Sequence, residues 1–128
     1  MTRQILRGLF YGSILAIIFV GLANAAQKLS GPEKQKIEAL IQAVESLKEA
    51  RFVRNGSAYS ADSAGYFLRR KWQANESNVG TARDFIDNVA SFSGTSGKPY
   101  LIRFKDGAEI PSREFLLGVL ARLDPFHG

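Results

Sequence analysis

Two dipeptides that end in glycine constrain the fold of this chain more than any other feature. Asn55-Gly56 lies between the short β-favouring pieces 52–54 and 57–59, and Asp106-Gly107 separates 100–104 from 108–110. Such a dipeptide between short apolar pieces is the strongest local signal for a type I′ hairpin turn, in which both central residues take positive φ. The sequence therefore predicts two antiparallel β-hairpins.

Helical patterns fill the chain around the two hairpins. Ser30 and Ser60 are expected to cap helices over 31–50 and 61–75, Thr81 to cap a third helix, and Pro111-Ser112 to lead into a last one. The apolar positions expected to face the core are Ile37, Leu40, Ile41, Val44 and Leu47; Ala61, Ala64, Leu68 and Trp72; Phe85, Ile86 and Val89; and Phe115, Leu116, Val119, Leu120 and Leu123. The prediction is an α+β fold with about four helices packed on a small antiparallel sheet made of two β-hairpins.

The start of the chain has the three parts of a secretory signal peptide. MTRQILRG carries two arginines and no acid, an apolar run follows, and Ala23-Asn24-Ala25 provides an A-x-A cleavage site. An uncleaved anchor is the alternative, but the run is shorter than the roughly 20 apolar residues of a membrane span. We therefore expect a signal peptide over residues 1–25 and a single exported domain over 26–128, located in the periplasm with no membrane contact after cleavage.

Composition narrows the classes of partner and chemistry. The chain has no cysteine, so an exported form holds no disulfide and must rest on packing alone. Removal of Arg3 and Arg7 with the signal peptide lowers the formal net charge from +5 to +3. The high pI of the whole chain therefore overstates the case for nucleic acid, and we expect no nucleic-acid partner.

Four segments, in this order, carry a resemblance to a known family: FVRNG at 52–56, LRRK at 68–71, TARDFIDNVAS at 81–91 and SGKPYLIRF at 96–104. With these segments the chain resembles a family of small exported bacterial proteins classed as a domain of unknown function. The resemblance covers nearly all of residues 26–128. It implies a location and a fold, and it implies no activity.

Several catalytic chemistries lack the residues they need. With no cysteine, and with His127 one residue from the end of the chain, a nucleophilic triad or a zinc site is not expected, and we predict no metal and no cofactor. Asp84 and Asp87 lie one helical turn apart and could act as an acid–base pair, although solvated surface carboxylates are the favoured interpretation. The basic cluster Arg69-Arg70-Lys71 is likewise interpreted as a solvated helix face.

The stretch SFSGTSGKP at 91–99 resembles a phosphate-binding loop only at first sight. A nucleotide-binding loop needs a glycine where this chain has Phe92 and a Ser or Thr where it has Pro99, and it leads from a strand into a helix. We favour a connector in which Gly94 and Gly97 take positive φ. The remaining hypothesis is a shallow anion site formed by Ser93, Thr95, Ser96 and Lys98, with Arg54 or Arg69.

The sequence thus favours a non-catalytic domain that binds an envelope protein or a small anionic ligand. The alternative is an envelope enzyme that uses carboxylate or serine chemistry. A deep cleft that holds Asp87 or Ser93 beside a second titratable group would favour the enzyme, and a shallow basic groove would favour the binding domain.

Overall fold

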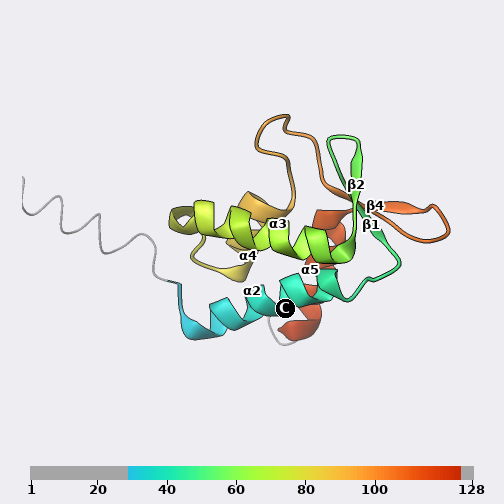
Figure 1. The fold of residues 1–128 in the computed structure, drawn as a ribbon. Helices are drawn as coiled ribbons and strands as arrows, with labels where there is room; N and C mark the ends of the chain where they lie inside the picture. Colours follow the sequence, from blue (N-terminus) through green and yellow to red (C-terminus); the bar gives the residue numbers. More distant parts are fainter. Residues whose placement is uncertain (1–28, 125–128) are drawn as a thin grey trace, which may run out of the picture.

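The computed structural model describes residues 29–124, so the predicted signal peptide and His127 lie outside the described residues (Figure 1). The helices are α2 (Gly31–Glu45), α3 (Ala61–Ala74), α4 (Ala82–Phe85), which continues as a π-helical turn over Ile86–Ala90, and α5 (Ser112–Leu123), with a short 3-10 turn at Glu76–Asn78. The strands are β1 (Arg51–Arg54), β2 (Ser57–Tyr59), β3 (Leu101–Arg103) and β4 (Glu109–Pro111). No helix within 29–124 has both the length and the apolar character needed to cross a membrane.

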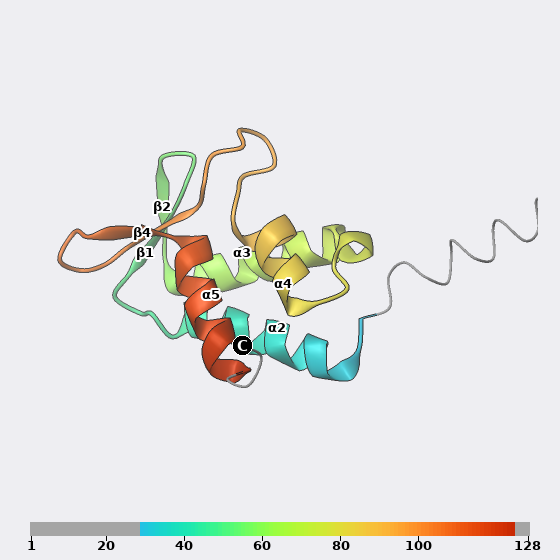
Figure 2. The same ribbon diagram turned by 180° about the vertical axis from the view of Figure 1, so that it is seen from behind.

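The two predicted hairpins join into one antiparallel sheet. The strand order is β2-β1-β3-β4, and the central pair brings Phe52 opposite Ile102. Figures 1 and 2 show the strands gathered at one end of the helices, with α2 and α3 running away from the sheet. The α+β prediction of about four helices and two hairpins is therefore confirmed.

Side-chain caps start three of the helices where the sequence predicts them. Ser30, Ser60 and Thr81 each accept a hydrogen bond from the backbone N–H three residues later, at 3.0–3.3 Å. Helix α2 differs at its other end, because it stops at Glu45 and not at residue 50. Tight turns over 46–50 follow it and bring the chain into β1, whose place beside β3 decides where the helix must end.

The first hairpin turn has the predicted geometry. Asn55 has φ 51° and Gly56 has φ 83°, as a type I′ turn requires. The positive φ of a non-glycine residue is uncommon and asparagine tolerates it well, so the dipeptide suits its position.

The second hairpin turn differs from the prediction. Phe104 N–H donates to Ala108 O at 2.8 Å, and Gly107 N–H donates to Phe104 O at 2.9 Å, which leaves a three-residue loop. In this loop Gly107 has φ 93°, whereas Asp106 does not have positive φ. The expectation of positive φ at both residues was wrong for Asp106, because a three-residue loop is a type I turn followed by one left-handed residue.

We expect Gly107→Val to lower the free energy of unfolding by about 1 kcal/mol or more, because a β-branched residue is strained at positive φ. Gly94→Val is the matched control, since Gly94 has open space around it and lacks positive φ. Urea denaturation of both variants measures the difference. Equal stability of the two would contradict the assigned turn.

The core lies between the helices and one face of the sheet. Its fully buried large side chains include Phe85, Ile41, Ile102 and Leu116, and Trp72 packs edge to face on Phe85 with ring centroids 5.8 Å apart. Leu123 was expected in this core and is instead 41% exposed, because it lies at the last turn of α5, past the end of the packed face.

One carboxylate links the start of α2 to the start of α4. Glu33 accepts hydrogen bonds from Ala82 N–H at 2.7 Å and from Lys36 Nζ at 2.9 Å. The backbone hydrogen bond from Ala82, followed by the bond from Lys36, holds the pKa of Glu33 below its usual range.

The pKa of Glu33 is lower in the folded protein than in the unfolded chain. The Glu33 carboxylate therefore stabilises the fold fully above the ordinary glutamate pKa of about 4.3. This stabilisation is lost as the pH falls through the pKa of Glu33 in the folded protein. We expect Glu33→Gln to cost about 1 kcal/mol at pH 7, with the difference from the native protein shrinking in acid. Thermal unfolding between pH 3 and pH 7 measures this, with the exposed Glu76→Gln as control. A difference that does not change with pH would overturn the assignment.

Candidate functional site

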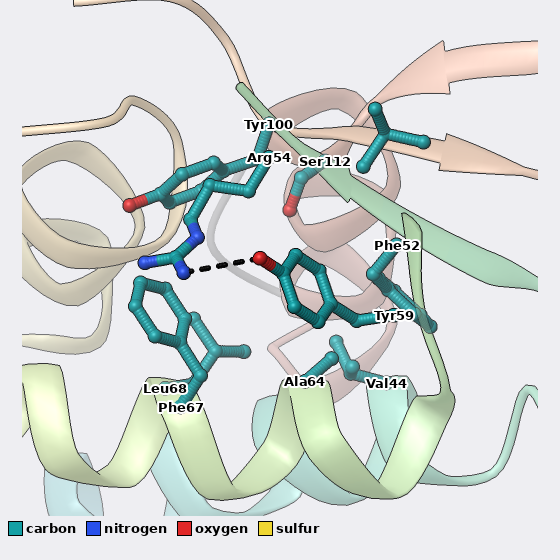
Figure 3. Close-up of a pocket in the computed structure, with 10 residues that line it drawn as sticks. Val44, Phe52, Arg54, Tyr59, Ala64, Phe67, Leu68, Tyr100 and Ser112 are labelled. Carbon is teal, nitrogen blue, oxygen red and sulfur yellow. Dashed lines mark hydrogen bonds between the residues drawn. The ribbon is translucent and has the colours of Figure 1, made fainter. Parts of the chain in front are cut away.

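A small cavity opens between the first hairpin and α3 (Figure 3). Its volume is about 60 Å³. The lining residues are Val44, Phe52, Val53, Arg54, Tyr59, Ala64, Phe67, Leu68, Tyr100 and Ser112. Most of these are apolar, and the charged group among them is Arg54.

Secondary-structure periodicity directs these side chains to one place. Phe52 pairs with Tyr59 across the hairpin, so both lie on the same face of the sheet, and Arg54 lies two residues further along that face. Ala64, Phe67 and Leu68 are spaced three and four residues apart and share the side of α3 that meets the hairpin. The cavity therefore lies between one face of the first hairpin and one side of α3.

The Arg54 side chain lies between aromatic rings at the rim of the cavity. Its guanidinium carbon is 4.4 Å from the centroid of Phe67 and 5.3 Å from that of Tyr59, and Nη2 donates a hydrogen bond to Tyr59 Oη at 3.3 Å. Figure 3 shows the guanidinium between these two side chains, above the cavity. The hydrogen bond from Arg54 lowers the pKa of the Tyr59 hydroxyl. The rings hold the cation by cation–π attraction.

Lys71 reaches the same region from the next turn of α3. Its Nζ donates to Tyr100 Oη at 2.8 Å and to Phe92 O at 2.7 Å. Burial lowers the pKa of Lys71, and the positive charge of Arg54 lowers it further. Burial also raises the pKa of Tyr100, against the opposing effect of Arg54. Arg54 lies against the ring of Phe67, and that ring contacts the Tyr100 ring edge to face with centroids 5.7 Å apart, so the two cations are neighbours across these two rings.

Within residues 29–124, neither Arg54 nor Lys71 forms an ion pair with a carboxylate. The half-buried Arg69 does so, with both Glu38 and Glu45. Charges removed from water are normally paired, because desolvation disfavours the charged form. The rim of the cavity is therefore positive and has no compensating acid in the described structure.

The predicted anion loop is tied together by its own hydroxyls. Ser93 Oγ accepts from the N–H groups of Thr95 and Ser96 at 3.3 and 3.4 Å and from Asn55 Nδ2 at 3.2 Å. Ser96 Oγ accepts from Lys98 N–H at 3.2 Å and donates to Asn55 Oδ1 at 2.5 Å. These bonds attach the loop to the first hairpin turn and occupy the amides expected to face an anion.

The other predicted site residues lie apart from one another. Arg69 points to the acids of α2, whereas Arg54 lines the cavity, and Lys98 is exposed on the loop. Of the two loop glycines expected at positive φ, Gly97 has φ 73° and Gly94 does not have positive φ, because the Ser93 hydroxyl already closes that turn. The anion site at the loop stays a prediction.

Asp84 and Asp87, the pair considered as an alternative for acid–base chemistry, have other partners. Asp84 accepts from Gly80 N–H at 3.0 Å. Burial by itself would raise the pKa of Asp87, but its ion pairs with Arg113 and Arg83 outweigh that and lower it. Neither aspartate lines the cavity. Within residues 29–124, no group of three or more His, Cys, Asp or Glu residues is placed to hold a metal ion.

The basic cluster on α3 separates into three environments. Arg69 pairs with α2, Arg70 is exposed beside Tyr66, and Lys71 turns toward the cavity rim. The interpretation of this cluster as a solvated helix face therefore holds for Arg70, whereas Arg69 and Lys71 are half-buried at the flanks of the apolar side. Phe67 and Lys71 are four residues apart and therefore lie on one side of the helix, and this spacing was the sequence signal that could have placed Lys71 near the cavity.

The fold and this site define a small α+β domain with a cation-rimmed apolar cavity. The chain belongs to the family of unknown function DUF5329, which matches residues 31–124. It is also similar to the uncharacterized protein YfeK of Salmonella typhimurium strain LT2, with 41% identity over 68 residues. That match covers 53% of this chain and 57% of YfeK, so the chain spans little more than half of this relative. No solved structure matches the chain.

Proposed function

We propose that this protein is a non-catalytic binding domain of the bacterial cell envelope and that it binds a small anion between Arg54 and Lys71. The observation that carries the proposal is that Arg54 lines an apolar cavity and that the Lys71 ammonium lies on the hydroxyl of Tyr100, a residue of the same lining. Neither cation has a carboxylate partner in the described residues. An anion between them would relieve their mutual repulsion and gain charge-assisted hydrogen bonds.

The lining of the cavity favours binding over catalysis. Acid–base or nucleophilic catalysis needs a base within hydrogen-bond reach of the reacting group. Among residues 29–124, no carboxylate or histidine lines the cavity, and neither Asp87 nor Ser93 does so. Tyr100, whose pKa burial raises, stays protonated at neutral pH and acts as a hydrogen-bonding group.

The periplasmic location is part of this proposal. It is supported by the basic start of the chain, the apolar run after it, and Ala23-Asn24-Ala25. Cleavage is expected between Ala25 and Ala26. The intact mass of protein released from the periplasm tests this, and a full-length precursor in the membrane fraction would contradict it.

A titration of isotope-labelled protein with acetate, sulfate and inorganic phosphate tests the anion site. We expect the largest changes at the side-chain signals of Arg54, Lys71 and Tyr59. Changes confined to the backbone amides of 94–98 would instead place the anion at the loop and favour that prediction. The absence of change at both places at millimolar anion would overturn the proposed function.

We expect Arg54→Met to weaken anion binding at least about tenfold, the range for loss of a charge-assisted hydrogen bond. Arg70→Met is the matched control, because it makes the same change of charge at an exposed position nearby on α3. Its effect should be below about twofold, since exposed charges are largely screened. Methionine fills similar space at position 54 and ends the repulsion of Lys71, while it loses the cation–π contacts and the hydrogen bond to Tyr59, so the melting temperature should change little. Equal affinity of the two variants would contradict the site.

A further inference from the structure

We infer that the ligand of this site is a carboxylate joined directly to a short aliphatic group. The carboxylate lies between Arg54 and Lys71, and the aliphatic group enters the cavity that Arg54 lines. This inference rests on the proposed function and adds the chemical class of the ligand.

The floor of the cavity selects the aliphatic group. Val44, Ala64 and Leu68 come from two helices and present only carbon to the space under Arg54 (Figure 3). The volume of about 60 Å³ is well below the roughly 150 Å³ of an apolar cavity that accepts benzene. A chain of a few carbons therefore fits, and an aromatic ring does not.

The rim selects the charged group. A guanidinium has five N–H donors in a plane, and the structure uses one of its nitrogens for Tyr59. The Lys71 ammonium has three donors, of which Tyr100 and Phe92 take two. Donors on both cations are left for the two oxygens of a carboxylate. The aromatic side chains of Tyr59 and Phe67, which flank Arg54, favour a small planar head group.

The cavity is small enough to fix how the charged and apolar parts of the ligand are arranged. Arg54 and the apolar floor line the same small cavity, so the charged and apolar parts of the ligand must be adjacent. Two kinds of molecule have this chemistry. One is a free short-chain fatty acid, and the other is the carboxyl end of a peptide whose last residue has a small aliphatic side chain.

Wild-type protein and a series of small ligands test the inference by calorimetry or NMR titration. Butyrate is expected to bind about tenfold more tightly than acetate, from the burial of two further methylene groups. Hexanoate and benzoate should gain nothing over butyrate, and butyramide should bind at least about tenfold more weakly, because it lacks the charge. N-acetyl-glycyl-alanine, compared with its C-terminal amide, tests the peptide source. Tighter binding of that peptide acid than of butyrate would assign the peptide end.

A filled cavity provides the second test. Ala64→Val should remove the advantage of butyrate over acetate, whereas the exposed Ala74→Val at the end of the same helix should leave both affinities unchanged. Should Ala64→Val fail to fold, the ligand series on the native protein decides by itself.

The outcomes separate the two proposals. Equal affinity for acetate and butyrate, or equal affinity for butyrate and butyramide, would overturn the carboxylate–aliphatic inference, while binding of acetate and phosphate at Arg54 would leave the anion site intact. Failure of every anion to bind would overturn both proposals.

Discussion

Replacing Phe85 with alanine is expected to lower the free energy of unfolding by about 3 to 5 kcal/mol. The Phe85 side chain is fully buried at 0% exposure and packs against the ring of Trp72. Its removal leaves a cavity that the surrounding helices fill only in part, so both transfer free energy and packing are lost. A domain of this size has a total stability of about 5 to 15 kcal/mol, so this substitution removes a large share of it and should lower the melting temperature strongly.

Phe92→Ala makes the same chemical change at a position that is 47% exposed, and it is the matched control. We expect it to cost less than about 1 kcal/mol, as for surface substitutions away from special features. Chemical denaturation of both variants, followed by tryptophan fluorescence, gives the comparison. Similar losses for Phe85→Ala and Phe92→Ala would contradict the described core.

The close approach of α2 and α3 at Gly65 predicts the second large effect. A Cβ atom at position 65 would lie 2.2 Å from Glu45 Oε2 and 2.4 Å from Glu45 Cγ, so an alanine there must displace the Glu45 side chain. That movement also breaks the contact between Glu45 and Arg69. We expect Gly65→Ala to destabilise the domain by about 2 kcal/mol, within the range for overpacking.

A double-mutant cycle isolates the cause. In a Glu45→Ala background the obstacle is absent, and Gly65→Ala should then be neutral or stabilising by up to about 1 kcal/mol, because alanine favours a helix more than glycine does. The coupling between the two positions should exceed about 2 kcal/mol. Additive effects of the two substitutions would show that Glu45 is not the group that excludes a side chain at 65.

The cationic rim has a consequence for stability as well as for binding. Arg54 and Lys71 repel each other, and the described residues supply no acid between them. Native proteins commonly retain such unfavourable arrangements at functional sites. A gain of stability in Arg54→Met together with a loss of anion affinity would fit this pattern, and a large loss of stability would indicate a structural role for the cation.

Features encoded within a few neighbouring residues could be predicted from the sequence. The caps at Ser30, Ser60 and Thr81 and the turn at Asn55-Gly56 depend on hydrogen bonds and φ angles over three or four residues, so their signals are local. The α+β class follows from the same signals, since they divide the chain into helices and hairpins. The family resemblance rests on short segments of this kind, and membership of a family of unknown function is confirmed.

Features that depend on distant neighbours could not be predicted in this way. The end of α2 at Glu45 is decided by the place of β1 in the sheet, and the loop around Asp106 is decided by the register of β3 and β4. The exposure of Leu123 likewise depends on how much of α5 the other elements cover.

The candidate site is the clearest case of this difference. Arg54, Lys71 and Tyr100 come from a strand, a helix and the residue before another strand, and no local pattern connects them. The sequence by itself determined the elements, their caps and the first hairpin turn, because the interactions that form them span only a few residues. The tertiary structure alone decided which cations are paired with acids and which meet at the cavity, because charge compensation depends on distances through space.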